Sequence, residues 1–221
     1  GDFKIRRTGA VSFSYYGLRQ RWRNLSPGLP GFHQHQNAAL VLAACEILKQ
    51  NGYGLSESLV RRGLTETRWP GRLEVVSTAP FILIDGAHNL AAAKSLASYI
   101  TEALTDKKIT LIIGILDDKA YPAILNILVP LCRTVILTRP RIERALAPEL
   151  LNNALPPGNR ETILTSSVAE AIQLGLERVS APGKALCIAG SLYVAGEARA
   201  ALRENGFDFS GRKSSPDFAG I

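Results

Sequence analysis

The chain has 221 residues, of which 46% are hydrophobic and 20% are charged. This composition is typical of a globular protein and excludes a collagen-like, low-complexity or wholly disordered chain. The net charge of +7 is concentrated in residues 1–69, where ten Lys and Arg stand against four Asp and Glu. The arginines there are scattered and lie in no motif that reads bases, so we expect no nucleic-acid partner.

Three further features of the sequence concern the membrane, the cellular compartment and the length of the natural protein. No apolar run reaches the roughly 18–20 residues of a membrane span, so we expect no membrane partner. The cysteines Cys45, Cys132 and Cys187 lie far apart in apolar segments, which favours buried thiols in a reducing, cytoplasmic compartment. The chain starts with Gly1 and contains no methionine, from which we expect a piece of a longer protein.

Residues 11–25 predict a β-hairpin. Val11, Phe13 and Tyr15 alternate with polar residues, residues 17–20 suit a turn, and residues 21–25 alternate again. Because an isolated hairpin is only marginally stable in water, we expect its sheet to include strands that lie outside this chain.

Two helices are predicted after this hairpin. The first spans residues 37–50, with Asn37 as its cap, and the second begins at Ser56 and ends at Gly63. His33 and His35 have a spacing that two metal ligands could use. No carboxylate or cysteine lies near them, so we expect no metal site.

The pattern changes at Trp69-Pro70-Gly71, which we interpret as a hinge or domain boundary. Beyond it, apolar strands alternate with helices. Strands are predicted at 73–77, 81–85, 109–113, 134–138, 161–164 and 185–189, and helices at 89–104, 119–131, 148–154, 167–179 and 192–204. This order predicts an α/β fold, a Rossmann-like and mostly parallel sheet with helices on both faces. We assign residues 70–205 to this domain, residues 1–69 to a separate one, and residues 206–221 to a loose tail.

Ligands of such sheets bind beyond the carboxyl ends of the strands, which share one rim. Asp85 ends an apolar strand there, Gly86 permits a tight turn, and Asn89 can cap the next helix. A carboxylate and the nearby His88 would suit a ribose hydroxyl and a ring or phosphate. The alternative is that Asp85 and Asn89 only organise the turn. Arg72 could likewise hold a phosphate, stack on a base, or be an ordinary surface arginine.

Two more segments of the rim carry polar residues. Ser191 follows Gly190 at the start of a helix, which suits an anion, but no base accompanies it to make it a nucleophile. Asp117 and Asp118 could form a catalytic pair. Adjacent side chains diverge, however, so we expect them to cap a helix instead. We therefore predict no catalytic residue and no metal ligand in this chain.

Four segments together resemble one known family. They are residues 31–39 (GFHQHQNAA), 68–74 (RWPGRLE), 85–89 (DGAHN) and 190–197 (GSLYVAGE). In this order they resemble the folylpolyglutamate synthase/dihydrofolate synthase family of the Mur ligase superfamily. Other Mur ligases share the architecture but have a different sequence at residues 85–89.

The resemblance implies a carboxyl-terminal portion of an ATP-dependent ligase. Residues 1–69 would end its ATPase domain, and residues 70–205 would form the Mur ligase C-terminal domain. Asn37, Arg72 and Asp85 match positions that bind ATP in the family, and His88 lies in the same nucleotide loop. Ser191 and Tyr193 would face the glutamate or pteroyl substrate.

The resemblance also implies the reaction. A phosphoryl group passes from ATP to a carboxylate of dihydropteroate or folate, and the amino group of L-glutamate attacks the acyl phosphate, a step of folate and one-carbon metabolism. The phosphate loop and the Mg²⁺ ligands would lie in a missing N-terminal ATPase domain, so the chain alone should be inactive. In this chain Ala120 follows Lys119, where the family commonly has an acidic residue.

Two alternatives stay open at this point. One is another Mur-type amide ligase that acts on a cell-wall precursor. The other is a nucleotide-binding module without catalytic activity.

Overall fold

The computed structural model describes residues 3–9 and 11–209, which form two compact units that adjoin in sequence between Pro70 and Gly71. Most of the predicted loose tail lies outside the described residues. Within its described part, Phe207 and Phe209 pack against the core of the second unit, so this part is not loose as we predicted.

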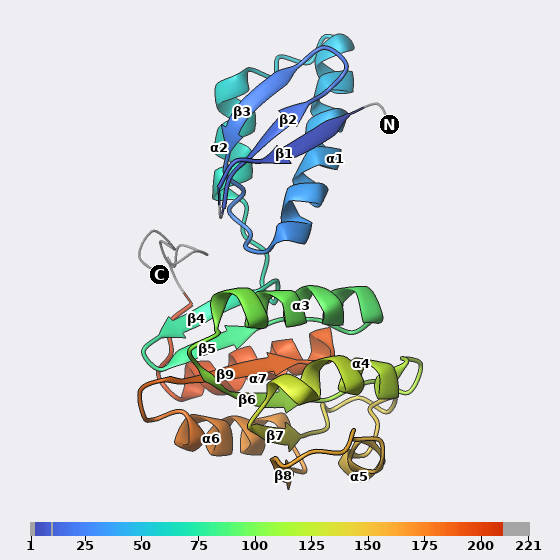
Figure 1. Ribbon diagram of the computed structural model, residues 1–221, viewed down its shortest axis with the longest axis vertical. Coiled ribbons are helices and arrows are strands. Elements are labelled where there is room, and N and C mark those ends of the chain that lie inside the picture. The colour runs from blue at the N-terminus through green and yellow to red at the C-terminus, as the bar shows by residue number, and fades with distance from the viewer. Residues whose placement is uncertain (1–2, 10, 210–221) are drawn as a thin grey trace. The chain divides into compact units, whose positions relative to one another are not determined.

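The first unit is a three-stranded antiparallel sheet with two helices (Figure 1). Its elements are β1 (Lys4–Arg7), β2 (Phe13–Tyr16), β3 (Arg21–Leu25), α1 (Phe32–Gln50) and α2 (Glu57–Glu66). The predicted hairpin is present as β2 and β3, which pair antiparallel with Tyr16 opposite Arg21. The expectation that its partners lie outside the chain overlooked β1, which pairs with β2.

The buried carboxylate of Glu46 ties the hairpin to α1. The Tyr15 hydroxyl donates to Glu46 Oε2 at 2.8 Å, and the Arg19 amide donates to Oε1 at 2.8 Å. Around this contact, apolar side chains from the strands and both helices are buried together: Phe13, Tyr15, Trp22, Leu25, Ala38, Ala39, Leu42, Val60 and Leu64. A hairpin that would be marginal alone is thereby stabilised by packing within the chain.

Both helices of this unit depart from the predicted boundaries. α1 begins at Phe32 after Gly31, so Asn37 lies inside the helix and does not cap it. Ser56 caps α2 as predicted by accepting the Leu59 amide, but the helix passes through Gly63 to Glu66. The buried side chains of α2 outweigh the weak helix propensity of one glycine.

The second unit is a six-stranded sheet in the order β4-β5-β9-β6-β7-β8. The strands are β4 (Glu74–Thr78), β5 (Phe81–Ile84), β6 (Lys108–Ile113), β7 (Thr134–Leu137), β8 (Glu161–Leu164) and β9 (Lys184–Ala189). β4 runs antiparallel to β5, and every other neighbouring pair is parallel. The predicted mostly parallel α/β sheet is confirmed.

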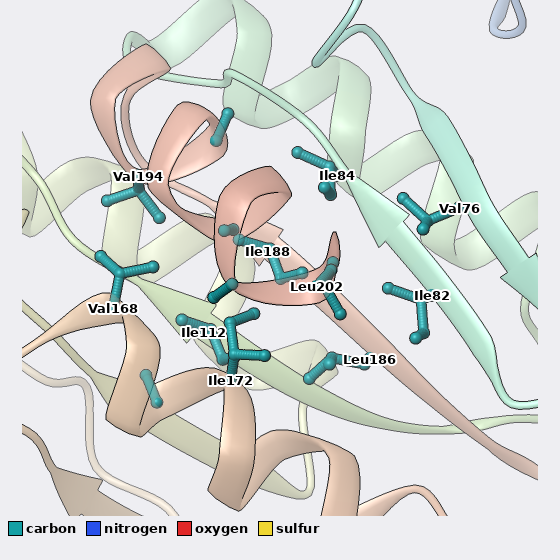
Figure 2. Packing of buried hydrophobic residues seen from close by; sticks show 14 of the residues in the cluster. Val76, Ile82, Ile84, Ile112, Val168, Ile172, Leu186, Ile188, Val194 and Leu202 are labelled. Atoms are coloured by element: carbon teal, nitrogen blue, oxygen red, sulfur yellow. The ribbon is translucent and has the colours of Figure 1, made fainter. Parts of the chain in front are cut away.

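Helices cover both faces of this sheet (Figure 1). They are α3 (Leu90–Ala103), α4 (Tyr121–Leu128), α5 (Pro148–Asn153), α6 (Val168–Arg178) and α7 (Leu192–Glu204), with a 3₁₀ turn at Val129–Leu131. Figure 2 shows the core under α6 and α7, where Val168, Ile172 and Val194 meet the strand residues Ile112 and Ile188. No described helix has the length and apolar character needed to cross a bilayer.

Glycines let the carboxyl ends of β9 and β6 approach backbone to backbone. Gly190 has φ +107°, and a Cβ there would lie 2.5 Å from the carbonyl oxygen of Gly114. Any side chain would force these two strand ends apart. By contrast, a Cβ at Gly196 inside α7 would meet nothing within 4 Å.

These surroundings predict opposite effects of two alanine substitutions. Gly190→Ala should lower the free energy of unfolding by roughly 2–5 kcal/mol, because it adds both backbone strain and a steric clash. Gly196→Ala should raise it by about 0.5–1 kcal/mol, because alanine is the better helix former. Urea unfolding followed by circular dichroism measures both. Equal effects of the two variants would show that the strand ends do not need the glycine.

Candidate functional site

Three segments meet where β5 and β9 end. Because β4 runs antiparallel to β5, the turn before β4 lies beside the end of β5, with Glu74 opposite Ile84. The Gly86 amide donates to the Gly71 carbonyl at 2.6 Å, and the Gly190 amide donates to the Ala87 carbonyl at 3.0 Å. We call the surface formed by residues 71–73, 85–89 and 190–195 the rim site.

Asp85 is the buried carboxylate of the rim site. The residue is 8% exposed, and its Oδ2 accepts the Leu73 amide at 2.8 Å. Burial raises the pKa of this carboxyl to about 6. The amides of Leu73 and Ala87 and the charges of Arg72 and His88 favour the ionised form and so lower the pKa, but burial has the larger effect. A carboxylate has about four acceptor positions, so the two amides leave capacity for a hydroxyl donor.

His88 and Asn89 follow Asp85 at the start of α3. Asn89 caps the helix by accepting the Ala92 amide at 2.9 Å, as predicted. His88 Nδ1 lies 2.8 Å from the Gly86 carbonyl oxygen. A carbonyl only accepts, so Nδ1 carries the proton and Nε2 is left to face a ligand.

Arg72 lies in the turn before β4, which begins at Glu74, one residue after the predicted start of the strand. Its side chain is exposed, and the flanking Gly71 and Leu73 both have positive φ, +70° and +45°. Its charge is close enough to lower the pKa of Asp85. The structure therefore brings Arg72, Asp85 and His88 together at the rim site.

Ser191 and Tyr193 begin α7 on the same rim. Ser191 is 1% exposed, and its hydroxyl accepts the Val194 amide at 3.0 Å, so it caps the helix. Tyr193 is 51% exposed. Its ring is accessible to a ligand, whereas the hydroxyl of Ser191 is already engaged by the helix.

The prediction that Asp117 or Asp118 caps the next helix is wrong. α4 begins after Ala120 without a side-chain cap. Asp118 instead lies 2.6 Å from Arg144 Nη2 and 2.6 Å from Lys119 Nζ, and these cations hold the pKa of its carboxyl below the ordinary value. Arg144 is distant from Asp118 in sequence, so no local sequence pattern could predict this ion pair.

Two glutamates in segments that continue from the rim site were not predicted as site residues. Glu74 accepts the Gly71 amide at 2.9 Å, and Glu197 of α7 accepts the Arg141 amide at 2.7 Å. Both belong to segments that carried the family resemblance, 68–74 and 190–197. That membership was the available signal, because neither residue follows a pattern that specifies its partner.

Asn37 lies in the first unit, within α1. Its amide donates to Gln34 Oε1 at 3.0 Å. Both residues line a cavity of about 370 Å³ between α1 and α2, whose other walls are mostly apolar, among them Val41 and Leu59. The cavity therefore offers an apolar space with an amide at its edge.

The two histidines before Asn37 each contact a neighbouring side chain of the first unit. His33 Nε2 lies 3.0 Å from Gln34 Nε2. His35 is buried and stacks on Phe13, with 5.0 Å between ring centroids. Within residues 3–9 and 11–209, no three His, Cys, Asp or Glu side chains lie together in a way that could hold a metal ion.

Residues 71–192 match the family described as Mur ligase, glutamate ligase domain. The chain is 36% identical over 192 residues to folylpolyglutamate synthase of Lacticaseibacillus casei. It is 29% identical over 192 residues to dihydrofolate synthase/folylpolyglutamate synthase of Bacillus subtilis. Each alignment covers 86% of this chain but only 43% and 44% of the relatives, so the chain spans less than half their length.

Solved structures agree with these matches. Mycobacterium tuberculosis folylpolyglutamate synthase, solved with ADP and AMPPCP, is 28% identical and superposes with a TM-score of 0.80 over 97% of this chain and 49% of that one. Escherichia coli FolC, solved with DHPP and ADP, gives a TM-score of 0.82 over 93% of this chain and 47% of that one. At 23% identity the second comparison shows the shared fold alone.

The raised pKa of Asp85 predicts how stability depends on pH. The protonated carboxyl is favoured in the folded state, so its contribution is present below pH 4 and is lost as the pH rises through about 6. Asp85→Asn cannot ionise, and its amide oxygen still accepts the Leu73 amide. The variant should therefore gain up to about 3 kcal/mol of unfolding free energy relative to the wild type between pH 4 and pH 7. Urea unfolding of both proteins across this range measures the gain, and a difference that stays constant with pH would contradict it.

Proposed function

We propose that the chain forms part of an ATP-dependent ligase, because it belongs to the Mur ligase family. Residues 71–192 of the chain are the part that matches the glutamate ligase domain of this family. The proposed reaction joins L-glutamate to dihydropteroate or to the glutamate tail of a folate. The named relatives are folylpolyglutamate and dihydrofolate synthases, and this supports the choice of substrates.

The contact between Asp85 and Leu73 carries the proposal, because it holds the Arg72 turn beside a buried carboxylate at one rim. In the proposed complex, Asp85 accepts a ribose hydroxyl of ATP, and Arg72 pairs with its phosphates. A guanidinium suits this role because its planar donors match phosphate oxygens. His88 Nε2 supplies a further hydrogen-bonding group at the same place.

We assign the purine of the nucleotide to Asn37. An amide side chain can pair with the hydrogen-bonding edge of adenine, and the apolar cavity beside Asn37 suits a flat ring. Tyr193, which is accessible, and Ser191 are assigned to the glutamate or pteroyl substrate. The capping bond of Ser191 leaves its hydroxyl proton as the group it can offer.

ATP supplies the phosphoryl group that converts a substrate carboxylate into an acyl phosphate, and the amino group of L-glutamate then displaces phosphate to form the amide. The residues of the rim site bind and orient the nucleotide; none of them is assigned a proton transfer. We place Mg²⁺ and its ligands outside the residues described here. The chain contains no phosphate-loop motif, and we expect it to be inactive on its own.

Arg72→Ala tests the proposal in the natural protein that carries this chain. The variant should lower kcat roughly 100-fold with dihydropteroate or tetrahydrofolate as glutamate acceptor, because it removes a cation from the transferring phosphates. Its Tm should stay unchanged, since the side chain is exposed. Arg133→Ala is the matched control, an exposed arginine at the amino end of β7, and should keep full activity.

Three results would reject parts of this proposal. Near-normal turnover of Arg72→Ala would remove Arg72 from the nucleotide site. Activity of the unaltered protein on a muramyl precursor, with none on folates, would assign it to a different Mur-type reaction. Nucleotide binding without turnover of either acceptor would leave a binding module.

A further inference from the structure

The backbone around Arg72 is held in an unfavourable conformation. Leu73 has φ +45°, a region that residues other than glycine seldom adopt, and its side chain is fully buried. Such conformations persist only where the surroundings enforce them. Two of the enforcing contacts have been described, from Gly86 to the Gly71 carbonyl and from Leu73 to Asp85.

Glu74 supplies a third contact, which reaches across to α7. Its Oε2 accepts the Gly71 amide at 2.9 Å, while its Oε1 pairs with the guanidinium of Arg199. The side chains of Arg199 and Glu74 are only 18% and 21% exposed. Water and salt therefore screen this ion pair less than a surface pair, and it can fix the carboxylate against the turn.

Helix α7 supports the turn along one side. Ser191, Ala195 and Arg199 are spaced four residues apart and so share a side of the helix. A Cβ at Gly71 would lie 3.5 Å from the Cβ of Ala195, which shows how closely the turn approaches this side. The ring of Phe209 packs against the guanidinium of Arg199, with 4.3 Å between the ring centroid and the guanidinium carbon.

We propose that Arg199, acting through Glu74, is a positioning residue that holds Arg72 in place for the nucleotide. This inference rests on the proposed function. Arg199 orients the Glu74 carboxylate, the carboxylate fixes the Gly71 amide, and Gly71 and Leu73 together set the direction in which Arg72 leaves the turn. Without the ion pair the strained turn relaxes, and a displacement of about 1 Å at the phosphates can cost up to roughly 100-fold in rate.

The test is a double-mutant cycle in the natural protein. Arg199→Met keeps much of the side-chain length but removes the charge, and it should lower kcat about 10-fold or more with little change in the KM for L-glutamate. Arg199→Lys should recover part of the rate, because it restores a cation to Glu74. Arg203→Met is the matched control: Arg203 also lies over Phe209, at 5.2 Å, and should be replaceable without loss.

The cycle separates positioning from a general structural role. If Arg199 acts through Arg72, Arg199→Met should cost nothing further in an Arg72→Ala background. An equal loss in both backgrounds, or full activity of Arg199→Met, would overturn the inference. If the unaltered protein joins glutamate to no acceptor, the proposed function fails instead. Amide exchange of Gly71 and Leu73 then decides the positioning separately: faster exchange in Arg199→Met than in Arg203→Met supports it, and equal exchange refutes it.

Discussion

The hydrogen bond from the Leu73 amide to the buried Asp85 carboxylate is the contact on which the rim site depends. It exists because β4 is the one strand of the second unit's sheet that runs against its neighbour, so that the turn before β4 lies at the carboxyl end of β5. Had β4 joined in parallel, Arg72 would lie at the opposite end of the sheet from Asp85. The direction of a single edge strand thus decides which charged groups share the site.

Two features of the rim site lower the stability of the fold. Burial of Asp85 disfavours its ionised form, and the positive φ of Leu73 disfavours the turn. One cost falls on Asp85 and the other on Leu73, which adjoins Arg72, and we assign Asp85 and Arg72 to the nucleotide. The surrounding core consists of apolar side chains without such conflict. Buried ionisable groups and strained backbone at the carboxyl ends of strands are typical of functional sites, because a bound ligand can form hydrogen bonds and ion pairs that the protein alone does not provide.

The sequence predicted much of the second unit. Continuous apolar strands and helix caps such as Asn89 are local signals, and the shared rim follows from parallel topology. We did not predict the direction of β4, although the sequence contains the signal: only residues 78–80 separate the two predicted strands, and a connection this short allows only antiparallel pairing. β1 was missed because Lys4–Arg7 is almost entirely charged. The pairings of Asp118 with Arg144 and of Glu74 with Arg199 join residues far apart in sequence, and only the folded chain specifies them.

The family resemblance and the geometry support each other from different directions. The resemblance named Arg72 from one segment and Asp85 and His88 from another, and the fold brings these three to one place. Asn37 lies in the other unit, and its assignment depends on the resemblance and on the cavity beside it.

A crystal structure of the natural protein with a non-hydrolysable ATP analogue would show whether the rim site binds the nucleotide. We expect a ribose hydroxyl within about 2.6–3.2 Å of the Asp85 carboxylate and the Arg72 guanidinium on a phosphate oxygen. A nucleotide bound away from the carboxyl ends of β5 and β9, with Asp85 and Arg72 both free of contact to it, would show that these residues do not form its site.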